Sequence, residues 1–377
     1  MKNKKLTVWE AACIITGYGI GGGVLAMPYI AQKNGIFVSL AILLVAFAAS
    51  WLLHMMIAET AQKCGKDAQI VGVFSRFLFR GKAKKILTVA FFALMAFVLV
   101  TNLTAYIAGA AEVLAGFLPF SDFVGKLIFY VIAASVVLFG LKAVGISEKL
   151  AVSIIFLLIG SLAVASFLAP AHELPTRAGT LGDGISFFSM AMLSFAAFFS
   201  IPQAVEGLDG DMKKVRKAVF LGLGNNLILI LVITFCALLS SETVTEVAMT
   251  GWSAGIGVWA QIIGGVFTAL AMLTTYWSIS LALSGIIEEQ LGWNTRICWL
   301  LATLPSLLIS LMSVGSFIDF LELAGGAIAI IVAVLFIPTY RNSRNEVPGS
   351  TLGVLGSTPF QIATVIAYLL MAIGSVI

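Results

Sequence analysis

Charged side chains are scarce in this sequence. Asp, Glu, Lys and Arg together make up 11% of the 377 residues, which is about half the fraction of a soluble domain. Hydrophobic residues make up 60%, and the mean hydropathy is +1.07. Such a chain has too little polar surface to cover a water-soluble fold, so the composition indicates a protein whose solvent is largely lipid.

Residue types that carry enzyme chemistry are also sparse. The chain has two histidines, and its cysteines stand singly, with no C-x-x-C spacing for zinc or redox work. We find no Ser–His–acid set and no soluble domain to hold a cofactor, and we therefore expect no enzyme and no cofactor. The net charge of +4 comes from Lys and Arg in short loops, so it reports topology and not a nucleic-acid partner. No small-residue cleavage site follows the N-terminal lysines, and we expect no cleaved signal peptide.

Long apolar segments recur along the whole chain. A membrane-spanning helix needs about 20 predominantly apolar residues. Eleven segments qualify, with the ranges 9–33, 36–62, 86–117, 125–141, 149–169, 184–207, 218–240, 257–289, 296–314, 315–337 and 359–377. The sequence therefore predicts an all-α integral membrane protein with 11 transmembrane helices, forming a single transmembrane domain over residues 1–377.

The loops between these segments differ in positive charge. With a cytoplasmic N-terminus, all but three of the 22 Lys and Arg residues fall on the cytoplasmic side, the exceptions being Lys33, Lys126 and Arg177. Cytoplasmic loops of membrane proteins carry the excess of Lys and Arg. We therefore expect a cytoplasmic N-terminus, an external C-terminus and a multi-pass protein of a bacterial or archaeal plasma membrane.

The order of the spans indicates an internal repeat. Five spans (9–169) precede five more (184–337) and one extra helix (359–377), and an odd number of spans inverts the second repeat. Each half opens with a small-residue-rich helix containing Pro28 or Pro202, and its third span is the longest and follows its longest loop (63–85 or 241–256). Inverted repeats with broken first helices are typical of secondary transporters. In the first of these loops, "DAQIVGVFSRFLFR" predicts a short amphipathic helix on the cytoplasmic surface, with a solvated basic loop as the alternative.

The stretch "GYGIGGG" lies inside the first span. Its spacing matches both a dinucleotide-binding loop and a helix-packing motif. The first needs a preceding strand, which is missing, and the second accounts only for Gly19 and Gly23. Glycine costs ~1 kcal/mol relative to alanine in a helix, so five glycines followed by Pro28 favour an unwound segment. Such a segment survives at membrane depth only where it lines a cavity or is buried in protein.

An unwound segment presents backbone groups of opposite polarity. We expect free carbonyls near Thr16 and Gly17 and free N–H groups where the second half-helix begins. The N–H end suits a carboxylate, and the carbonyl end suits an ammonium group or a metal cation. Together they match a zwitterionic amino acid. The predicted substrate-binding residues here are Thr16, Gly17, Gly19, Gly21, Gly22 and Gly23.

The symmetry-related break is expected in the sixth span. Its small and aromatic residues are Ser194, Phe195, Ala196, Ala197, Phe198 and Phe199. We expect Ser194, Phe195 and Phe198 to line the pocket, with core or lipid packing as the alternative for each phenylalanine.

Two motifs carry a family resemblance. "GYGIGGGVLAMPYIAQKNG" resembles the first span of the amino acid/auxin permeases, including the bacterial hydroxy and aromatic amino acid permeases, in which a glycine-rich break precedes a segment like that of Leu25, Pro28 and Tyr29. "IPQAVEGLDGDMKKVRKAV" resembles their sixth span and following loop. The resemblance covers nearly the whole chain and places it near the amino acid-polyamine-organocation superfamily. It implies a leucine-transporter-type 5+5 inverted repeat with broken spans 1 and 6, and amino acid uptake driven by a cation gradient.

One departure from the family pattern concerns histidine. Relatives often carry a histidine near the sixth-span break, where this chain has Phe198, Phe199 and Ser200. Substrate choice and proton handling therefore do not transfer from the resemblance.

Two kinds of coupling site stay open. "ALAMLTTYWS" places Ala271, Thr274 and Thr275 on adjoining positions of the eighth span. This A-x-x-T-T resembles the sodium site of related folds, where carbonyls of Gly17 and Ile20 would complete the shell. The alternative is threonines that bond to carbonyls of their own helix. A proton route needs a buried titratable group, and the candidate proton acceptors or gates are Glu112, Asp319 and Glu322, followed by Glu59, Glu206, His54 and His172.

The function predicted from these features is secondary active transport. We expect alternating-access uptake of a neutral, aromatic or hydrophobic amino acid together with sodium or a proton, across a lipid bilayer. Asn102 and Tyr106, one turn apart in the third span, are expected at the substrate, where the resemblance implies a tyrosine that closes over the carboxylate; packing is their alternative role. A different class, a channel or a transporter-like nutrient sensor, is the competing interpretation.

Overall fold

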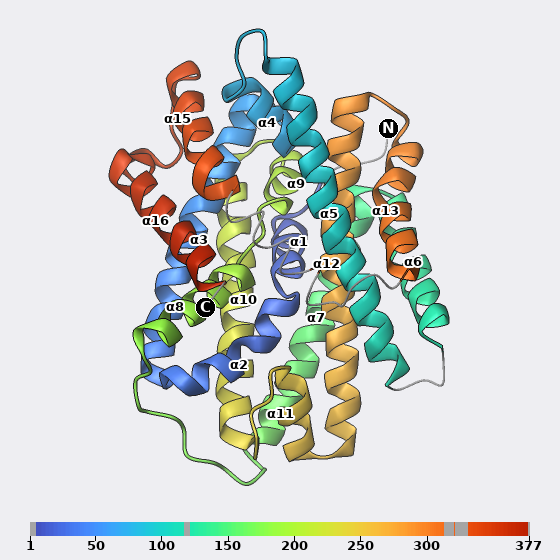
Figure 1. Cartoon of the computed structure of the whole chain (residues 1–377), viewed down its shortest axis with the longest axis vertical. Coiled ribbons are helices and arrows are strands. Elements are labelled where there is room, and N and C mark those ends of the chain that lie inside the picture. Colours follow the sequence, from blue (N-terminus) through green and yellow to red (C-terminus); the bar gives the residue numbers. More distant parts are fainter. Residues whose placement is uncertain (1–4, 117–120, 313–319, 321–330, 376–377) are drawn as a thin grey trace.

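Helices account for all the regular secondary structure in the part of the chain that the structure, a computed structural model, describes. That part comprises residues 5–116, 121–312, 320 and 331–375. Figure 1 shows the helices arranged as an elongated bundle. The all-α architecture predicted from the sequence is confirmed.

The first half contains a bent helix pair followed by five further helices. Their bounds are α1 Val8–Gly19, α2 Gly22–Asn34, α3 Ile36–Cys64, α4 Ile70–Phe77, α5 Lys84–Ala115, α6 Asp122–Leu138 and α7 Leu141–Ser166.

In the described residues, the second half repeats this order as far as α13, the counterpart of α6. Its bounds are α8 Leu181–Ser194, α9 Ser200–Gly207, α10 Met212–Ser240, α11 Ala248–Ile256, α12 Val258–Leu291 and α13 Thr295–Leu311. The C-terminal part contains the π-helix η1 Val332–Phe336, α15 Ile337–Glu346, the 3-10 turn η2 Gly353–Gly356 and α16 Thr358–Gly374.

Membrane-length helices are present in both halves. Among the described residues α3, α5, α7, α10 and α12 are each long and apolar enough to cross a membrane, and α1 with α2 passes as one further span bent by 60°. The helices α13 and α16 are apolar but shorter, at 17 residues each, and most of the predicted tenth span lies outside the described residues. The count of 11 spans therefore stays a prediction.

Both broken helices begin with the same local structure. Thr7 caps α1 and forms a capping box with Glu10, and Thr180 caps α8 and forms one with Asp183. In each box the hydroxyl and the carboxylate satisfy backbone N–H groups at the helix start. The helices α1 and α8 thus begin in the same way, and the repeat and its boundaries stay a prediction.

Two spanning helices start well before the predicted residue. The helix α10 begins at Met212 instead of 218, because Asp211 caps it by accepting from the backbone N–H groups of Lys213 and Lys214. The pKa of Asp211 lies below its usual value, since a hydrogen bond from the Lys214 side chain favours the carboxylate. The helix α7 begins at Leu141 instead of 149, so it includes charged residues that hydropathy assigned to a loop.

The loops before the two longest helices each contain a short helix. The first, α4, was predicted; its apolar residues Ile70, Val71, Val73, Phe74 and Phe77 are buried against the bundle, whereas Arg76 is exposed. The second, α11, was not predicted. Figure 1 shows α4 and α11 at opposite ends of the bundle, as inverted halves require.

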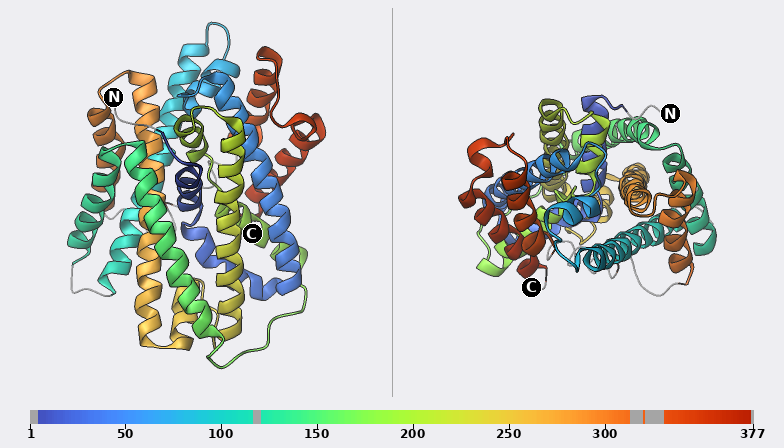
Figure 2. Two further views of the ribbon diagram at one scale, coloured as in Figure 1. Left: turned by 180° about the vertical axis from the view of Figure 1, so that it is seen from behind. Right: turned by 90° about the horizontal axis from the view of Figure 1, so that it is seen from above.

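The helix α1 lies in the middle of the bundle and packs against α7, α9, α10 and α12 (Figures 1 and 2). The C-terminal helices α15 and α16 lie on the flank beside α3 (Figure 1). The broken helix with the glycines is therefore enclosed by other helices.

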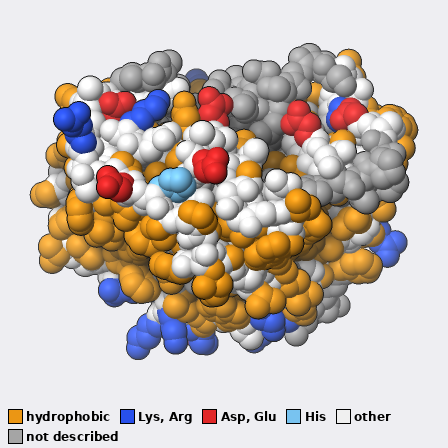
Figure 3. Space-filling model, turned by 90° about the horizontal axis from the view of Figure 1, so that it is seen from below, with side chains coloured by type: hydrophobic (Ala, Val, Ile, Leu, Met, Phe, Trp, Pro, Cys, Tyr) orange, Lys and Arg blue, Asp and Glu red, His pale blue; other side chains and the backbone are white. Residues whose placement is uncertain are grey.

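The surface is divided by side-chain type. On the face in Figure 3, acidic side chains and some Lys and Arg lie in the upper part, further Lys and Arg lie at the lower edge, and hydrophobic side chains cover most of the area between. An apolar zone between charged zones is the surface expected of a multi-pass membrane protein.

Candidate functional site

The first break separates α1 from α2 at Ile20 and Gly21. The N–H of Ile20 donates to the carbonyl of Thr16 at 3.0 Å, so this carbonyl is not free, contrary to the prediction. The carbonyl of Gly17 instead accepts hydrogen bonds from side chains of α12. Gly21 is the N-cap residue of α2 and has no side chain. The first N–H groups of α2 therefore receive no capping hydrogen bond from the N-cap position.

The glycines of the break are required by close neighbours. A Cβ on Gly17 would lie 2.1 Å from Oε2 of Glu148, and one on Gly19 would lie 2.1 Å from Nδ2 of Asn226. Cβ atoms essentially never approach heavy atoms this closely, so only glycine fits without a shift. These glycines let polar side chains reach bare backbone.

The second half of the break is equally crowded. A Cβ on Gly21 would lie 2.4 Å from the hydroxyl of Tyr106, and one on Gly23 would lie 2.6 Å from the hydroxyl and 3.2 Å from the backbone N of Ser194. Because Ser194 is the last residue of α8, the break of the first span lies directly against the break of the sixth. The structure therefore brings the two predicted breaks together.

The second break covers residues 195–199, between α8 and α9. Ser194, Phe195 and Phe198 are all buried. The Phe195 ring packs edge-on against Phe47 of α3, and the Phe198 ring packs against Phe199, which lies 6.5 Å from the Tyr18 ring of α1. Phe199, which was not among the predicted binding residues, thus contacts the first broken helix.

A histidine does lie at the second break, but it comes from α3. The N–H of Ala197 donates to Nε2 of His54 at 2.9 Å, and Nδ1 of His54 lies 2.6 Å from the carbonyl of Ser50. Since Ala197 is the donor, Nε2 must accept, and the ring proton sits on Nδ1 and points to Ser50. The fully buried His54 therefore supports the unwound backbone as a neutral ring.

The predicted sodium-site residues converge on one point. The hydroxyl of Thr275 lies 2.9 Å from the carbonyls of both Gly17 and Ala271, and that of Thr274 lies 3.4 Å and 2.9 Å from the same two oxygens. The hydrogen bonds to Ala271 are the own-helix bonds of the alternative interpretation, and the sodium site stays a prediction. Ile20 is buried, but no contact of its carbonyl joins this group among the described residues.

A buried carboxylate that sequence reasoning missed lies beside this point. Glu148 of α7 is fully buried, its Oε1 accepts from the hydroxyl of Ser278 at 2.8 Å, and its Oε2 has no hydrogen-bond partner among the described residues. It was missed because hydropathy started this span at 149. The sequence signal that could have found it is the glycine at position 140. In the structure Gly140 has a φ of 85° and lies at the boundary between α6 and α7.

Other buried polar groups also lack partners. Both side-chain polar atoms of the buried Asn226, Oδ1 of Asn102 and the hydroxyl of Tyr18 have no hydrogen-bond partner among the described residues. Tyr106 is buried and reaches Gly21. Buried polar groups are normally hydrogen-bonded, so unpaired donors and acceptors beside an unwound backbone indicate a place for a polar ligand. Asn226 was not predicted, because nothing in the sequence of α10 relates it to Gly19.

Thr16 has a different environment. Its hydroxyl lies 2.9 Å from the carbonyl of Ala12 and 3.1 Å from that of Gly222, and it accepts from Nδ2 of Asn225 at 3.1 Å. The Thr16 side chain is therefore occupied in joining α1 to α10.

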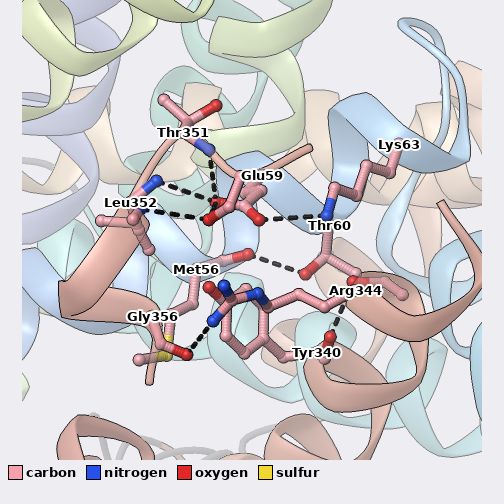
Figure 4. A network of polar contacts seen from close by, with 12 residues as sticks. Met56, Glu59, Thr60, Lys63, Tyr340, Arg344, Thr351, Leu352 and Gly356 are labelled. Atoms are coloured by element: carbon pink, nitrogen blue, oxygen red, sulfur yellow. Dashed lines mark hydrogen bonds and ion pairs between the residues drawn. The ribbon is translucent and has the colours of Figure 1, made fainter. Parts of the chain in front are cut away.

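Of the predicted gate residues, the structure describes only Glu112. Glu112 is exposed near the end of α5, and Asp319 and Glu322 lie outside the described residues. Glu59 is buried but fully engaged: it pairs with Lys63 at 3.1 Å and accepts from the backbone N–H groups of Thr351 and Leu352 at 3.1 Å each (Figure 4). A carboxylate held in this way has a structural role, attaching the segment after α15 to α3.

A separate hollow lies near the C-terminal end of α2. Its volume is about 450 Å³, and it is lined by residues 32–33 and 173–178. None of the predicted site residues lines it.

Two apposed helix breaks inside a bundle of membrane-length helices define a multi-pass membrane transport protein. The chain belongs to the tryptophan/tyrosine permease family, whose sequence profile matches residues 4–375. The expected amino acid permease is thus confirmed at that level, although the match does not single out the amino acid/auxin branch.

Individual relatives agree with this family. The chain is 27% identical over 355 residues to tyrosine-specific transport system 1 of Haemophilus influenzae, covering 85% of this chain and 84% of the relative. It is 23% identical over 349 residues to glutamine transporter 2 of Aliivibrio fischeri, covering 88% and 87%. These relatives are transporters, which fits the expectation that the chain is not an enzyme.

Solved structures establish the fold. Mhp1, a nucleobase-cation-symport-1 family transporter, matches with a TM-score of 0.64 at 12% identity, covering 99% of this chain and 91% of its own. MhsT in complex with L-phenylalanine matches with a TM-score of 0.61 at 16% identity, covering 98% and 99%. The leucine-transporter-type fold implied by the sequence is therefore confirmed.

Proposed function

We propose that this protein is a secondary active transporter that takes up a neutral amino acid, aromatic or hydrophobic, together with a cation. The observation that carries the proposal is the contact between the two breaks at Gly23 and Ser194, with unpaired polar groups buried around them. The relative named as a tyrosine-specific transport system supports an aromatic substrate.

The substrate backbone would lie along the first break. Its carboxylate would face the N-terminus of α2, where backbone N–H groups and the helix dipole favour an anion, with Tyr106 beside it. Its ammonium group would face Ser194 and the amide of Asn226, which supplies the acceptor that an ammonium needs. The rings of Tyr18, Phe198 and Phe199 would border its side chain.

The membrane arrangement belongs to the same proposal. Eleven spans with a cytoplasmic N-terminus and an external C-terminus account for the distribution of Lys and Arg in the sequence. We place the protein in a bacterial or archaeal plasma membrane, because the named transporter relatives are bacterial.

The coupling cation is sodium or a proton. A bound sodium ion would use the carbonyls of Gly17 and Ala271 and the hydroxyls of Thr274 and Thr275, and each hydroxyl already lies within hydrogen-bonding distance of both carbonyls. A proton would need a titratable group near the same break.

Ligand binding to the purified protein tests the proposal. A ligand that binds only the folded state stabilises it by mass action, by about 2.7 kcal/mol at a hundredfold excess over Kd. We expect L-tyrosine, L-phenylalanine or L-tryptophan to raise the melting temperature, whereas tyramine, which lacks the carboxylate, and 3-(4-hydroxyphenyl)propionate, which lacks the amine, leave it unchanged. If no amino acid of a full panel stabilises the protein, the proposal is wrong.

A channel is the competing interpretation, and electrical recording separates the two. A transporter gives saturable exchange of labelled substrate with little conductance. Ion conductance in planar bilayers without saturable substrate exchange would identify a channel.

A further inference from the structure

Glu148 is an acidic side chain in the interior of the bundle, and it belongs to none of the predicted substrate, sodium or gate sites. It is 0% exposed, and it lies where α7 packs on α1, with its Oε2 against the bare Cα of Gly17. A buried carboxylate is costly unless it is paired with a cation or carries a proton. Intramembrane acids with this placement mark ion or proton sites.

The hydrogen bonds around Glu148 fit the protonated acid. The hydroxyl of Ser278 lies 2.8 Å from Oε1 of Glu148 and 3.2 Å from the carbonyl of Ile14. Ser278 has one proton and cannot donate to both. If Oε1 carries a proton, Glu148 donates to Ser278 and Ser278 donates to Ile14, so each hydrogen is used once. If Glu148 is ionised, Ser278 turns to it, the contact to Ile14 loses its hydrogen, and Oε2 keeps a charge without a partner.

The groups around Glu148 do not neutralise it. From α1, Cys13 is near enough to interact electrostatically with Glu148 and with Lys149 of α7, and Glu10 is already paired with Lys142 of α7 at 2.6 Å. No Lys, Arg or His forms an ion pair with Glu148 in the described part of the chain.

The ionisable groups of the other neighbouring helices are directed elsewhere. On α12, Tyr276 packs edge-on against Phe129, Glu288 accepts from Thr295, and Glu289 accepts from backbone N–H groups of residues 69 and 72. On α9, Glu206 accepts from the amide of Gln69. From α6, α10 and α11 no charged group pairs with Glu148 among the described residues.

We propose that Glu148 binds the proton that is transported together with the substrate. This inference rests on the proposed function. The proton adds from water on the entry side to Oε1, is held against Ser278 while α1 is enclosed, and returns to water on the exit side, with no other bond made or broken. An ionised Glu148 disfavours the closed protein because its charge is uncompensated in a low dielectric. Proton binding and substrate binding are linked through the broken end of α1, because Gly17 lies against Glu148 and Gly19 lies against Asn226 of the proposed substrate site.

Proteoliposomes test this assignment in two modes. The membrane potential is held at zero. If one proton is transported per substrate molecule, a gradient of about one pH unit sustains about a tenfold accumulation of the substrate, because one pH unit is a tenfold ratio of proton activity. We expect the wild type to accumulate labelled substrate in this way. We expect Glu148→Gln, which keeps the shape and is permanently neutral, to equilibrate the substrate without accumulating it.

Exchange and binding supply the controls. Glu148→Gln should still exchange labelled for unlabelled substrate at equal pH, and should do so with less dependence on pH than the wild type. Glu148→Asp, which keeps a titratable group, should restore part of the accumulation. The exposed Glu242→Gln is the matched control and should behave as wild type.

The outcomes separate this inference from the proposed function. Proton-driven accumulation that survives in Glu148→Gln overturns the assignment and leaves the transporter intact, as does accumulation that only a sodium gradient drives in the wild type. If Glu148→Gln exchanges no substrate, restored accumulation in Glu148→Asp supports the assignment and its absence counts against it. A wild type that neither exchanges nor binds any amino acid refutes the proposed function itself.

Discussion

At the scale of single residues, the glycines of the first break are set by what lies opposite them. Gly17 faces Glu148, Gly19 faces Asn226, and Gly23 faces Ser194. The sequence predicted the break because many glycines in one helix are unfavourable. It could not predict which side chains fill the space, since Glu148 and Asn226 are more than a hundred residues away.

Gly23→Ala tests the contact between the two breaks. The new Cβ would lie 2.6 Å from the hydroxyl and 3.2 Å from the backbone N of Ser194, and α8 would have to move. We expect thermal stabilisation by substrate to be lost, with overpacking costing about 1–3 kcal/mol of folding free energy. The control is Gly160→Ala in α7, whose Cβ would meet no atom within 4 Å and which should bind substrate as the wild type does. Normal substrate binding by Gly23→Ala would show that the breaks do not form one site.

His54→Ala tests the support of the second break. The N–H of Ala197 would lose its acceptor, and leaving a buried donor unpaired costs about 1–3 kcal/mol. We expect a lower melting temperature in detergent and weaker substrate binding, partly recovered in His54→Gln, whose side-chain carbonyl can accept. An unchanged melting temperature in His54→Ala would contradict this role.

At the scale of helices, the packing of α1 on α10 depends on Gly222. A Cβ there would lie 2.7 Å from Cβ of Ile15 and 2.8 Å from the carbonyl of Ala12, whereas a Cβ on Gly224 would meet nothing within 4 Å. The carbonyl of Gly222 also lies 3.1 Å from the hydroxyl of Thr16. Two glycines on one helix therefore differ in role in a way that their sequence does not show.

Alanine at these two glycines should give opposite results. Gly222→Ala should separate α1 from α10 and reduce the free energy of unfolding by about 1–3 kcal/mol. Gly224→Ala should be neutral or stabilising by up to about 1 kcal/mol, because alanine is the better helix former. Thermal unfolding of both variants in the same detergent measures the difference, and equal loss of stability in both would argue against this packing.

Helix positions were predictable from hydropathy, but helix starts were not. The predicted starts of α3 and α12 agree with the structure within one residue. That of α7 is eight residues late, because a helix can carry Lys142 and Glu148 when its neighbours accommodate them through an ion pair with Glu10 and a hydrogen bond from Ser278. A hydropathy profile assigns such charged residues to loops, and Glu148, the acidic residue that lies against Gly17 of the first break, was therefore not predicted as a site residue.

At the scale of the whole molecule, the C-terminal segment is fastened to the transporter bundle. Glu59 of α3 pairs with Lys63 and accepts from Thr351 and Leu352, and the Arg344 side chain donates to the carbonyl of Gly356 (Figure 4). The sequence indicated Glu59 only as an acid near a span end. Its partners Thr351 and Leu352 could not be foreseen, because they lie nearly 300 residues further along the chain.

Glu59→Ala should release this segment. Lys63, whose side chain is 5% exposed, would keep a buried charge without a partner, and breaking a buried pair in this way costs about 3–5 kcal/mol. We expect faster hydrogen exchange over residues 350–356. Glu346→Ala, which removes a largely exposed pair with Arg80, is the control and should cost at most about 1 kcal/mol. Unchanged exchange over this segment in Glu59→Ala would contradict the fastening role.

Concentrative uptake by the reconstituted wild-type protein tests the central claim most directly. Proteoliposomes loaded at one pH and diluted into buffer of lower pH, with and without sodium, are given labelled L-tyrosine, L-phenylalanine or L-tryptophan. The account predicts that at least one of them rises inside above its outside concentration, and that dissipating the cation gradient with an ionophore abolishes the rise. Uptake of all three that never exceeds equilibrium under either gradient would contradict it.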